Sequence, residues 1–249
     1  MNSFIPWIGG KKLLRKEICN RFPVNFNRYI EVFGGAAWVL FYKDKHAETE
    51  VYNDINSNLV NLFKCIKYHS NAIEEEMEFL LNSREFFCDS KALYNFSSLT
   101  DIQRATAYFY IIKTSYGADL RNFGMKSRDI TNADFLKEVK ERLKKVIIEN
   151  KSYNDLIRQY DTKEALFYCD PPYYKAEKYY DTGEFTFNQE QHMNLNEMLK
   201  NIKGRCIISY NDHEFIRELY KGFNIVEIER QNGLSPNNNK YKELIIMNY

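Results

Sequence analysis

Hydrophobic and polar positions divide the chain into short apolar segments and longer amphipathic ones. Seven short segments, rich in β-branched and aromatic residues and bounded by polar or glycine-containing turns, predict strands. They cover residues 29–33, 49–52, 146–149, 165–169, 206–210, 223–228 and 243–247. Apolar residues at helical spacing predict helices over 38–41, from near Asn56 onwards, and over 133–145, 188–202 and 213–221.

The order of these segments predicts an α/β fold with a mostly parallel sheet, because strands and helices alternate along the chain. The last two strands are joined by the polar loop 231–240 without a helix. Two strands connected in this way pair antiparallel, so we expect a mixed sheet with one reversed strand.

A helix-rich stretch separates the second strand from the third. Residues 56–115 carry apolar side chains at helical spacing, which is too much helix for one crossover between neighbouring parallel strands. We therefore predict an inserted helical subdomain over residues 71–145. The sheet-bearing domain then comprises residues 1–70 and 146–249.

Composition narrows the class of protein. Hydrophobic residues make up 44% of the 249 positions, enough for a packed core, and a net charge of +1 argues against a purely electrostatic binder of nucleic acid. The five cysteines form no CxxC pair and suggest no zinc site. Free thiols suit a reducing cytoplasm, where we expect the protein to act. No apolar run has the length of a signal segment or a membrane span, so no membrane partner is expected.

The most informative candidate site follows the strand 165–169. In Asp170-Pro171-Pro172-Tyr173, the two prolines fix a stiff, extended corner that presents a carboxylate, proline carbonyls and aromatic rings. A carboxylate and a carbonyl can accept both hydrogens of an exocyclic amine while an aromatic ring stacks on the base. The corner therefore suits a flat, amine-bearing ring. The alternative is an ordinary turn at a strand end with exposed tyrosines.

Two glycine-containing segments favour a bound anion or nucleotide. Gly9-Gly10 precedes a helical pattern with Lys11 beside it, so free backbone N–H groups can face an anion, and Trp7 adds an aromatic face. A flexible arm whose tryptophan fills the core is the alternative. The small-residue turn 34–37 lies between a strand and a helix, as in a nucleotide-binding sheet. Its spacing is not GxGxxG, so a dinucleotide is not indicated.

Asp54 follows the second strand, twenty positions after Gly34. An acid at this offset binds ribose hydroxyls in nucleotide-binding sheets. Alternatively it caps the helix that starts near Asn56, and both roles can hold together. Because parallel strands bring their carboxyl ends to one edge, we expect the glycine turn, Asp54 and Asp170 to border one crevice.

The stretch 115–128 combines glycines, aromatic residues and three cations after the helix-rich region. A loop or hairpin that contacts phosphates and base edges is one interpretation, and a plain solvated loop is the other. The candidate DNA-binding residues are Tyr116, Arg121, Asn122, Lys126 and Arg128.

These segments together resemble the Dam-type, D12-class DNA adenine-N6 methyltransferases over most of the chain and in the family's order. The matching segments are Pro6-Trp7-x-Gly-Gly-Lys11, Glu31-x-Phe33-x-Gly35-Ala36, Asn53-Asp54-Ile55-Asn56, Asp170-Pro171-Pro172-Tyr173, Phe185-Thr186 with Gln189, Ile207-Ile208-Ser209 with Asn211-Asp212, and Glu243-Leu244. The resemblance implies a Rossmann-like, S-adenosylmethionine-dependent methyltransferase fold in which the insertion recognises the target.

The resemblance also implies roles for single residues. S-adenosylmethionine would be held by Trp7, Lys11, Phe33, Gly35, Asp54 and Asp170, with Asp54 on the ribose hydroxyls. The target adenine would be flipped out of double-stranded DNA into the pocket formed with Asp170, Pro171, Pro172 and Tyr173. Asp170 and the Pro171 carbonyl would accept the amine hydrogens and localise the nitrogen lone pair, while Tyr173 stacks on the ring. No metal is needed, because the methyl donor is already activated.

The chain departs from the family at two places. Ala37 stands where a second glycine is common, so we expect a slightly tighter cofactor loop. Members that read GATC share an Asn-Gly-x-x-Arg segment, whereas here Tyr116-Gly117 is followed by 118–121, ending in Arg121. The recognised sequence therefore stays open, as does a separate cognate restriction endonuclease. An RNA base methyltransferase and a catalytically inactive DNA-binding relative are the alternative functions.

Overall fold

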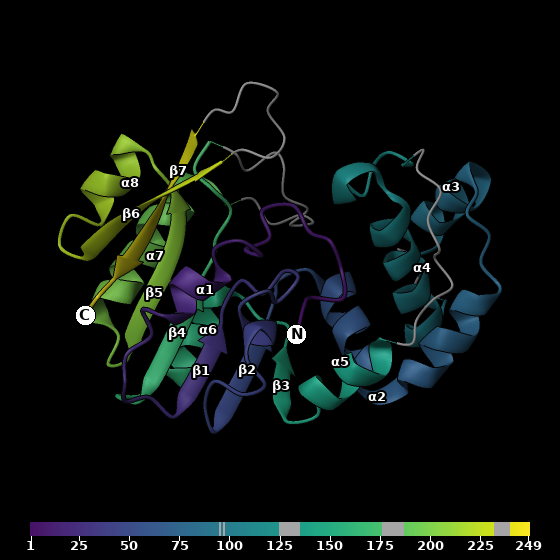
Figure 1. Cartoon of the computed structure of the whole chain (residues 1–249), viewed down its shortest axis with the longest axis horizontal. Helices are drawn as coiled ribbons and strands as arrows, with labels where there is room; N and C mark the ends of the chain where they lie inside the picture. Colours follow the sequence, from purple (N-terminus) through teal and green to yellow (C-terminus); the bar gives the residue numbers. More distant parts are fainter. Residues whose placement is uncertain (95, 97, 125–134, 176–186, 232–239) are drawn as a thin grey trace.

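The structure is a computed structural model, and it describes residues 1–94, 96, 98–124, 135–175, 187–231 and 240–249. A seven-stranded sheet forms its centre (Figure 1). In sheet order the strands are β3 (Val146–Glu149), β2 (Thr49–Asn53), β1 (Arg28–Glu31), β4 (Ala165–Cys169), β5 (Arg205–Asn211), β7 (Lys240–Met247) and β6 (Asn224–Gln231).

The predicted mixed, mostly parallel sheet is confirmed. Strands β3, β2, β1, β4 and β5 are parallel to one another, and β7 lies antiparallel between β5 and β6. From β1 the chain builds the sheet first toward β2 and β3, and then on the other side with β4 and β5. The carboxyl ends of β1 and β4 therefore meet at a topological switch point, where open parallel sheets bind ligands.

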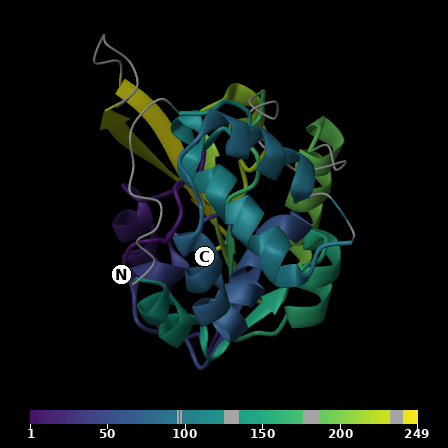
Figure 2. The same ribbon diagram turned by 90° about the vertical axis from the view of Figure 1, so that its right-hand side faces the viewer.

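Side chains alternate between the two faces of the sheet and divide the core in two. Ile30 and Phe167 belong to the buried cluster that includes side chains of α6, α7 and α8, whereas Tyr29 and Leu166 belong to the cluster that includes side chains of α1, α2, α4 and α5. In Figure 2 the blue and teal helices of the second group lie in front of the sheet. The helices are α1 (Arg15–Cys19), α2 (Ser57–Glu78), α3 (Arg84–Leu93), α4 (Asp101–Thr114), α5 (Leu136–Leu143), α6 (Tyr153–Tyr160), α7 (Gln189–Asn201) and α8 (Glu214–Leu219).

Helices α2 to α5 lie between β2 and β3 in the chain, where the sequence predicts an insertion. Asn56 caps α2, which runs across the expected boundary after residue 70 and is kinked at His69 (φ −135°, ψ 33°). Buried side chains of α2 and α4 share one core with Tyr52 of the sheet. The division into two domains therefore remains a prediction. None of the helices in the described ranges is long and apolar enough to cross a membrane.

The α-helix expected over 38–41 is wrong. The chain forms a short 3₁₀ turn there, η1 (Leu40–Tyr42). Ala37 before it has a left-handed backbone (φ 55°), and the Leu40 amide donates to the Glu31 carboxylate at 2.8 Å. An alanine in this conformation costs about 1–2 kcal/mol that a glycine avoids. The alanine thus adds backbone strain to the loop after β1.

Candidate active site

The carboxyl ends of β1, β2 and β4 border a pocket of about 260 Å³. Seven of the residues predicted to bind the cofactor or to act in catalysis line it: Trp7, Lys11, Phe33, Gly35, Asp54, Asp170 and Pro172. The other two catalytic candidates, Pro171 and Tyr173, are buried on either side of Pro172. Segments far apart in the sequence meet here because a parallel sheet collects its strand ends at one edge.

The segment from Trp7 to Lys11 packs against the glycine turn. Gly35 has a left-handed backbone (φ 48°), and a Cβ atom there would lie 3.0 Å from Cδ1 and Nε1 of Trp7. A Cβ atom on Gly10 would lie 2.6 Å from Nε1 of Trp38. Both contacts need glycine, so this segment is fixed against the sheet and is not a flexible arm.

Lys11 joins this segment to the Asp-Pro-Pro corner. Its side chain is only 3% exposed, and its Nζ lies 2.8 Å from Asp170 Oδ2 and donates to the Gly9 carbonyl at 2.6 Å. The same Nζ lies 4.7 Å from the centre of the Tyr173 ring, close enough for a cation–π contact. Tyr173 is 5% exposed, so an ordinary turn with exposed tyrosines does not describe it.

Asp170 is also held from the sheet. Its Oδ1 accepts a hydrogen bond from Ser209 Oγ on β5 at 2.8 Å, and this Oγ lies 3.0 Å from the Tyr168 hydroxyl on β4. Ser209 and Tyr168 are buried, whereas the Asp170 side chain is 17% exposed. The carboxylate therefore reaches the pocket from a fixed position. Ser209 lies in a segment that matches the family but had no predicted role.

Asp54 is not the N-cap of α2, a position that Asn56 holds, but its carboxylate binds two backbone amides beside the pocket. Its Oδ1 accepts from the Asn56 amide and its Oδ2 from the Gly35 amide, each at 2.8 Å. The Tyr52 hydroxyl donates to the Gly35 carbonyl at 2.8 Å. Asp54 thus links the glycine turn to the start of α2 and still lines the pocket.

Glu31 is a pocket residue to which the sequence assigned no role. It is buried at the end of β1, and its Oε2 accepts from the Tyr29 hydroxyl and the Leu40 amide, both at 2.8 Å. Burial raises the pKa of Glu31 to about 8, against the effect of these two hydrogen bonds. The carboxyl is therefore mostly protonated at neutral pH and ready to ionise beside a cation. Glu31 stands in the segment with Phe33 that resembles the family, and this position is the sequence feature that could have marked it as a site residue.

Of the predicted DNA-contact residues, the structure describes Tyr116, Arg121 and Asn122. Residues 115–124, here called the η2 segment after the 3₁₀ turn η2 (Tyr116–Ala118), close on themselves through a bridge between Ser115 and Phe123. Arg121 of this segment lines the pocket, and Tyr116 is 72% exposed outside it. Lys126 and Arg128 lie outside the described residues.

Asp119 organises the η2 segment. Its Oδ1 accepts from the amides of Arg121 and Asn122, and its Oδ2 accepts from the Asn122 side chain at 2.7 Å. Partial burial alone would raise the pKa of Asp119, but these hydrogen bonds outweigh it and lower the pKa below its usual value. Asn122 therefore stabilises the conformation of the η2 segment through its hydrogen bonds to Asp119, in addition to any contact with DNA.

Helix α3 contributes two further residues to the pocket, Lys91 and Tyr94. Lys91 Nζ donates to the Arg121 carbonyl at 3.1 Å, which ties α3 to the η2 segment. Neither residue lies in a motif, so only the tertiary arrangement reveals them. Among the described residues, no group of three or more His, Cys, Asp or Glu side chains is placed to hold a metal ion.

The pocket brings together the glycine turn, Asp54 and the Asp-Pro-Pro corner on a seven-stranded, mostly parallel sheet, which is consistent with a methyltransferase fold. The chain matches the model of the D12 class N6 adenine-specific DNA methyltransferases over residues 7–234, a range that includes every residue lining the pocket. The chain therefore belongs to this family, and its activity is site-specific methylation of adenine in DNA.

Several curated relatives cover nearly the whole chain. The Type II methyltransferase M.CviBI of Paramecium bursaria Chlorella virus NC1A is 26% identical over 93% of this chain and 91% of its own length. The DNA adenine methylase of Haemophilus influenzae is 25% identical over 97% and 92%. The Retron Ec67 DNA adenine methylase of Escherichia coli is 24% identical over 99% and 90%. The resemblance inferred from the motifs is confirmed.

Proposed function

We propose that the enzyme takes its methyl group from S-adenosylmethionine, which the family generally uses, and that the pocket at the ends of β1, β2 and β4 holds it. The residues present fit such a ligand. The turn at Gly35 has no room for a side chain, Asp54 offers a carboxylate to hydroxyls, and Glu31 offers a carboxyl that can ionise beside a cation. When bound, the cofactor supplies a methyl group on a positively charged sulfur.

Asp170 is the acceptor for the adenine amine in this proposal. The amine lone pair is delocalised into the ring, so it becomes nucleophilic only when its hydrogens are accepted by Asp170 and the Pro171 carbonyl. In this proposal the amine takes over the contact that Lys11 Nζ makes with Asp170 Oδ2 at 2.8 Å. The buried Tyr173 ring beside it supplies a stacking face, worth roughly 1–3 kcal/mol per base.

The substrate in this proposal is double-stranded DNA with the target adenine flipped out, because the amine is otherwise enclosed in the stack. The helices α2 to α5 form the target-recognition part. In this proposal the exposed Tyr116 and the pocket-lining Arg121 contact the duplex around the flipped base. DNA as substrate suits a cytoplasmic enzyme. The recognised sequence is set by this part of the chain, and a cognate endonuclease would be a separate protein.

The observation that carries this proposal is that Asp170 and the Gly35 turn border the same pocket. Incubation with labelled S-adenosylmethionine and either duplex DNA or ribosomal RNA tests it. We expect label on adenine N6 of DNA, loss of at least about 1,000-fold in rate for Asp170→Ala, and nearly unchanged DNA binding. Asp44→Ala, which removes an exposed acid far from any motif, should keep full activity.

Three results would contradict the proposal. Preferential labelling of RNA would favour an RNA base methyltransferase. A near wild-type rate in Asp170→Ala would show that Asp170 does not accept the amine. Absence of transfer to either substrate in the wild type, with DNA binding intact, would indicate an inactive relative.

A further inference from the structure

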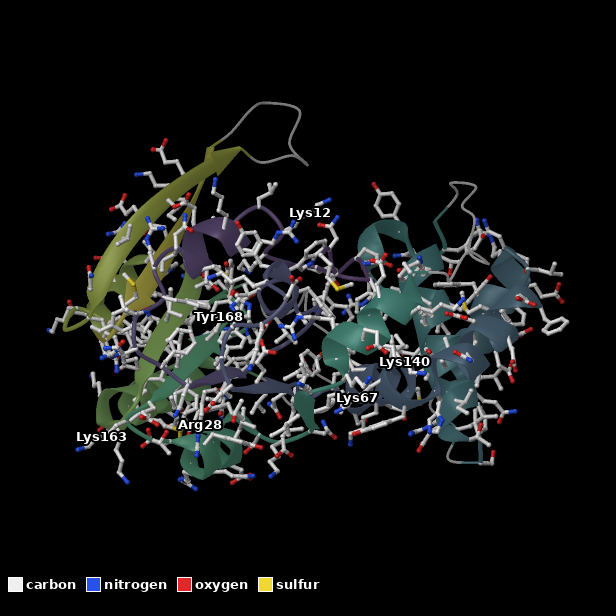
Figure 3. All side chains as sticks on the ribbon, turned by 60° about the horizontal axis from the view of Figure 1, so that its bottom comes forward. Lys12, Arg28, Lys67, Lys140, Lys163 and Tyr168 are labelled. Atoms are coloured by element: carbon white, nitrogen blue, oxygen red, sulfur yellow. The ribbon has the colours of Figure 1, made fainter. Side chains whose placement is uncertain are left out.

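Asp170 is connected to two buried hydroxyl groups on neighbouring strands. Tyr168 and Ser209 lie on β4 and β5, which pair in parallel with Cys169 opposite Ile208. Because side chains alternate along a strand, Tyr168, Asp170 and Ser209 all point to the face that carries the pocket. Ser209 is fully buried and Tyr168 nearly so. Figure 3 labels Tyr168, which lies in the middle of the sheet.

The direction of these hydrogen bonds follows from counting protons. Ser209 Oγ has one proton, and it donates this proton to Asp170 Oδ1 at 2.8 Å. The 3.0 Å contact between Ser209 Oγ and the Tyr168 hydroxyl must then have Tyr168 as its donor. The donors thus run in one direction, from Tyr168 through Ser209 to the carboxylate, and each bond strengthens the next.

This arrangement matters because the other carboxylate oxygen of Asp170 changes partner in the reaction. Lys11 Nζ lies 2.8 Å from Oδ2, and in the proposed reaction the amine takes over this contact. Ser209 contacts Oδ1 from the buried side, away from that exchange. A carboxylate fixed through one oxygen keeps the other aimed at the pocket while its partner is replaced.

We propose that Ser209 and Tyr168 are positioning residues that orient the Asp170 carboxylate toward the target amine. This inference rests on the proposed role of Asp170 as amine acceptor. Tyr168 itself lines the pocket, but in this scheme neither hydroxyl touches the adenine and both act through the carboxylate. Removal of either hydroxyl should therefore slow methyl transfer while leaving the binding of cofactor and DNA nearly unchanged.

The test compares Ser209→Ala, Tyr168→Phe, the double variant and Ser209→Thr in single-turnover methylation of duplex DNA. We expect Ser209→Ala to lower the rate roughly 10- to 100-fold, the effect of losing a hydrogen bond to a charged group. Tyr168→Phe should lower it about 3- to 10-fold, and the double variant should equal Ser209→Ala, because Tyr168 acts only through Ser209. KM values should change less than about 2-fold, and Ser209→Thr should recover most of the rate.

Ser70→Ala, which removes a buried hydroxyl on α2, is the matched control and should keep the wild-type rate. Multiplicative effects of the two single variants, or a wild-type rate in Ser209→Ala, would overturn the inference. If Ser209→Ala does not fold, a wild-type rate in Tyr168→Phe would overturn it instead. Asp170→Ala distinguishes failure of the positioning role from failure of the proposed function. If Asp170→Ala is inactive and Ser209→Ala is fully active, only the positioning role is refuted. An active Asp170→Ala refutes the proposed function itself.

Discussion

The strand ends on one side of the pocket and the η2 segment on the other are held by different kinds of contact. Lys11, Asp54 and Asp170 are fixed by bonds that join β-strands, the glycine turn and the N-terminal segment across long stretches of sequence. The η2 segment is fixed by Asp119, by the bridge at its base and by contacts with the neighbouring helix α3, from Lys91 to Arg121 and from Phe87 to Phe123. Such a segment can change its sequence with little effect on the strand ends, which suits a division between chemistry and target choice.

Replacement of a glycine by alanine in each region should give the largest difference between the strand ends and the η2 segment. The quantity compared is the affinity for the cofactor. Gly35→Ala places a Cβ atom 3.0 Å from the Trp7 ring at a positive φ, so we expect cofactor affinity to fall roughly 10- to 100-fold. Gly117→Ala also has a positive φ (58°), but no atom lies within 4 Å of its Cβ position. It should cost about 1–2 kcal/mol of stability and leave cofactor affinity unchanged. Calorimetric titration with S-adenosylmethionine measures both, and equal losses of affinity would remove the distinction.

Arg121→Ala should change how strongly the enzyme discriminates between DNA sequences. Loss of a guanidinium that reads a base edge should reduce discrimination at one base pair by about 1–3 kcal/mol, with little change in the rate on the preferred site. Binding to a set of duplexes with single base-pair changes gives this number. Arg158→Ala, on the exposed side of α6, is the control and should bind like the wild type. Equal weakening on every duplex would make Arg121 a phosphate contact.

A smaller effect should appear in the pH dependence of stability. Glu31 has a pKa of about 8 in the folded protein, so between its ordinary value and pH 8 the folded state holds a proton that the unfolded state has lost. The free energy of unfolding should therefore fall as pH rises, by at most about 1.4 kcal/mol per pH unit. Glu31→Gln keeps the size of the side chain and should remove this slope.

The difference between the wild type and Glu31→Gln from pH 6.5 to 8 isolates the contribution of Glu31. Burial lowers the pKa of His46 to about 4, so this histidine adds stability as pH rises, but only up to its ordinary value of 6.5. Within that window the charges that act on Glu31 are Asp170 and Arg142, and its hydrogen-bond donors are Tyr29 and Leu40. Chemical denaturation of the wild type and Glu31→Gln at both ends of the window measures the effect. Parallel curves for the two proteins would refute the raised pKa.

The sequence predicted the sheet well because each strand is a short apolar run with clear turns at its ends. It also marked the pocket, since parallel strands bring their carboxyl ends together and motifs after β1, β2 and β4 had to meet. The α-helix over 38–41 was wrong because the chain becomes extended at Lys43 (φ −118°, ψ 157°) after one 3₁₀ turn, an ending that the apolar periodicity does not contain. Lys91 and Tyr94 were missed for a similar reason, because they reach the pocket only through the packing of α3.

The central claim is that Asp170, at the strand ends, performs the chemistry, whereas Arg121, in the η2 segment, selects the target sequence. Sequencing of N6-methyladenine in genomic DNA exposed to the wild type, Arg121→Ala or Asp170→Ala tests this most directly. We predict one sequence context for the wild type, adenine methylation in a wider set of contexts for Arg121→Ala, and none for Asp170→Ala. Identical contexts for the wild type and Arg121→Ala, or methylated adenine from Asp170→Ala at the wild-type level, would contradict the account.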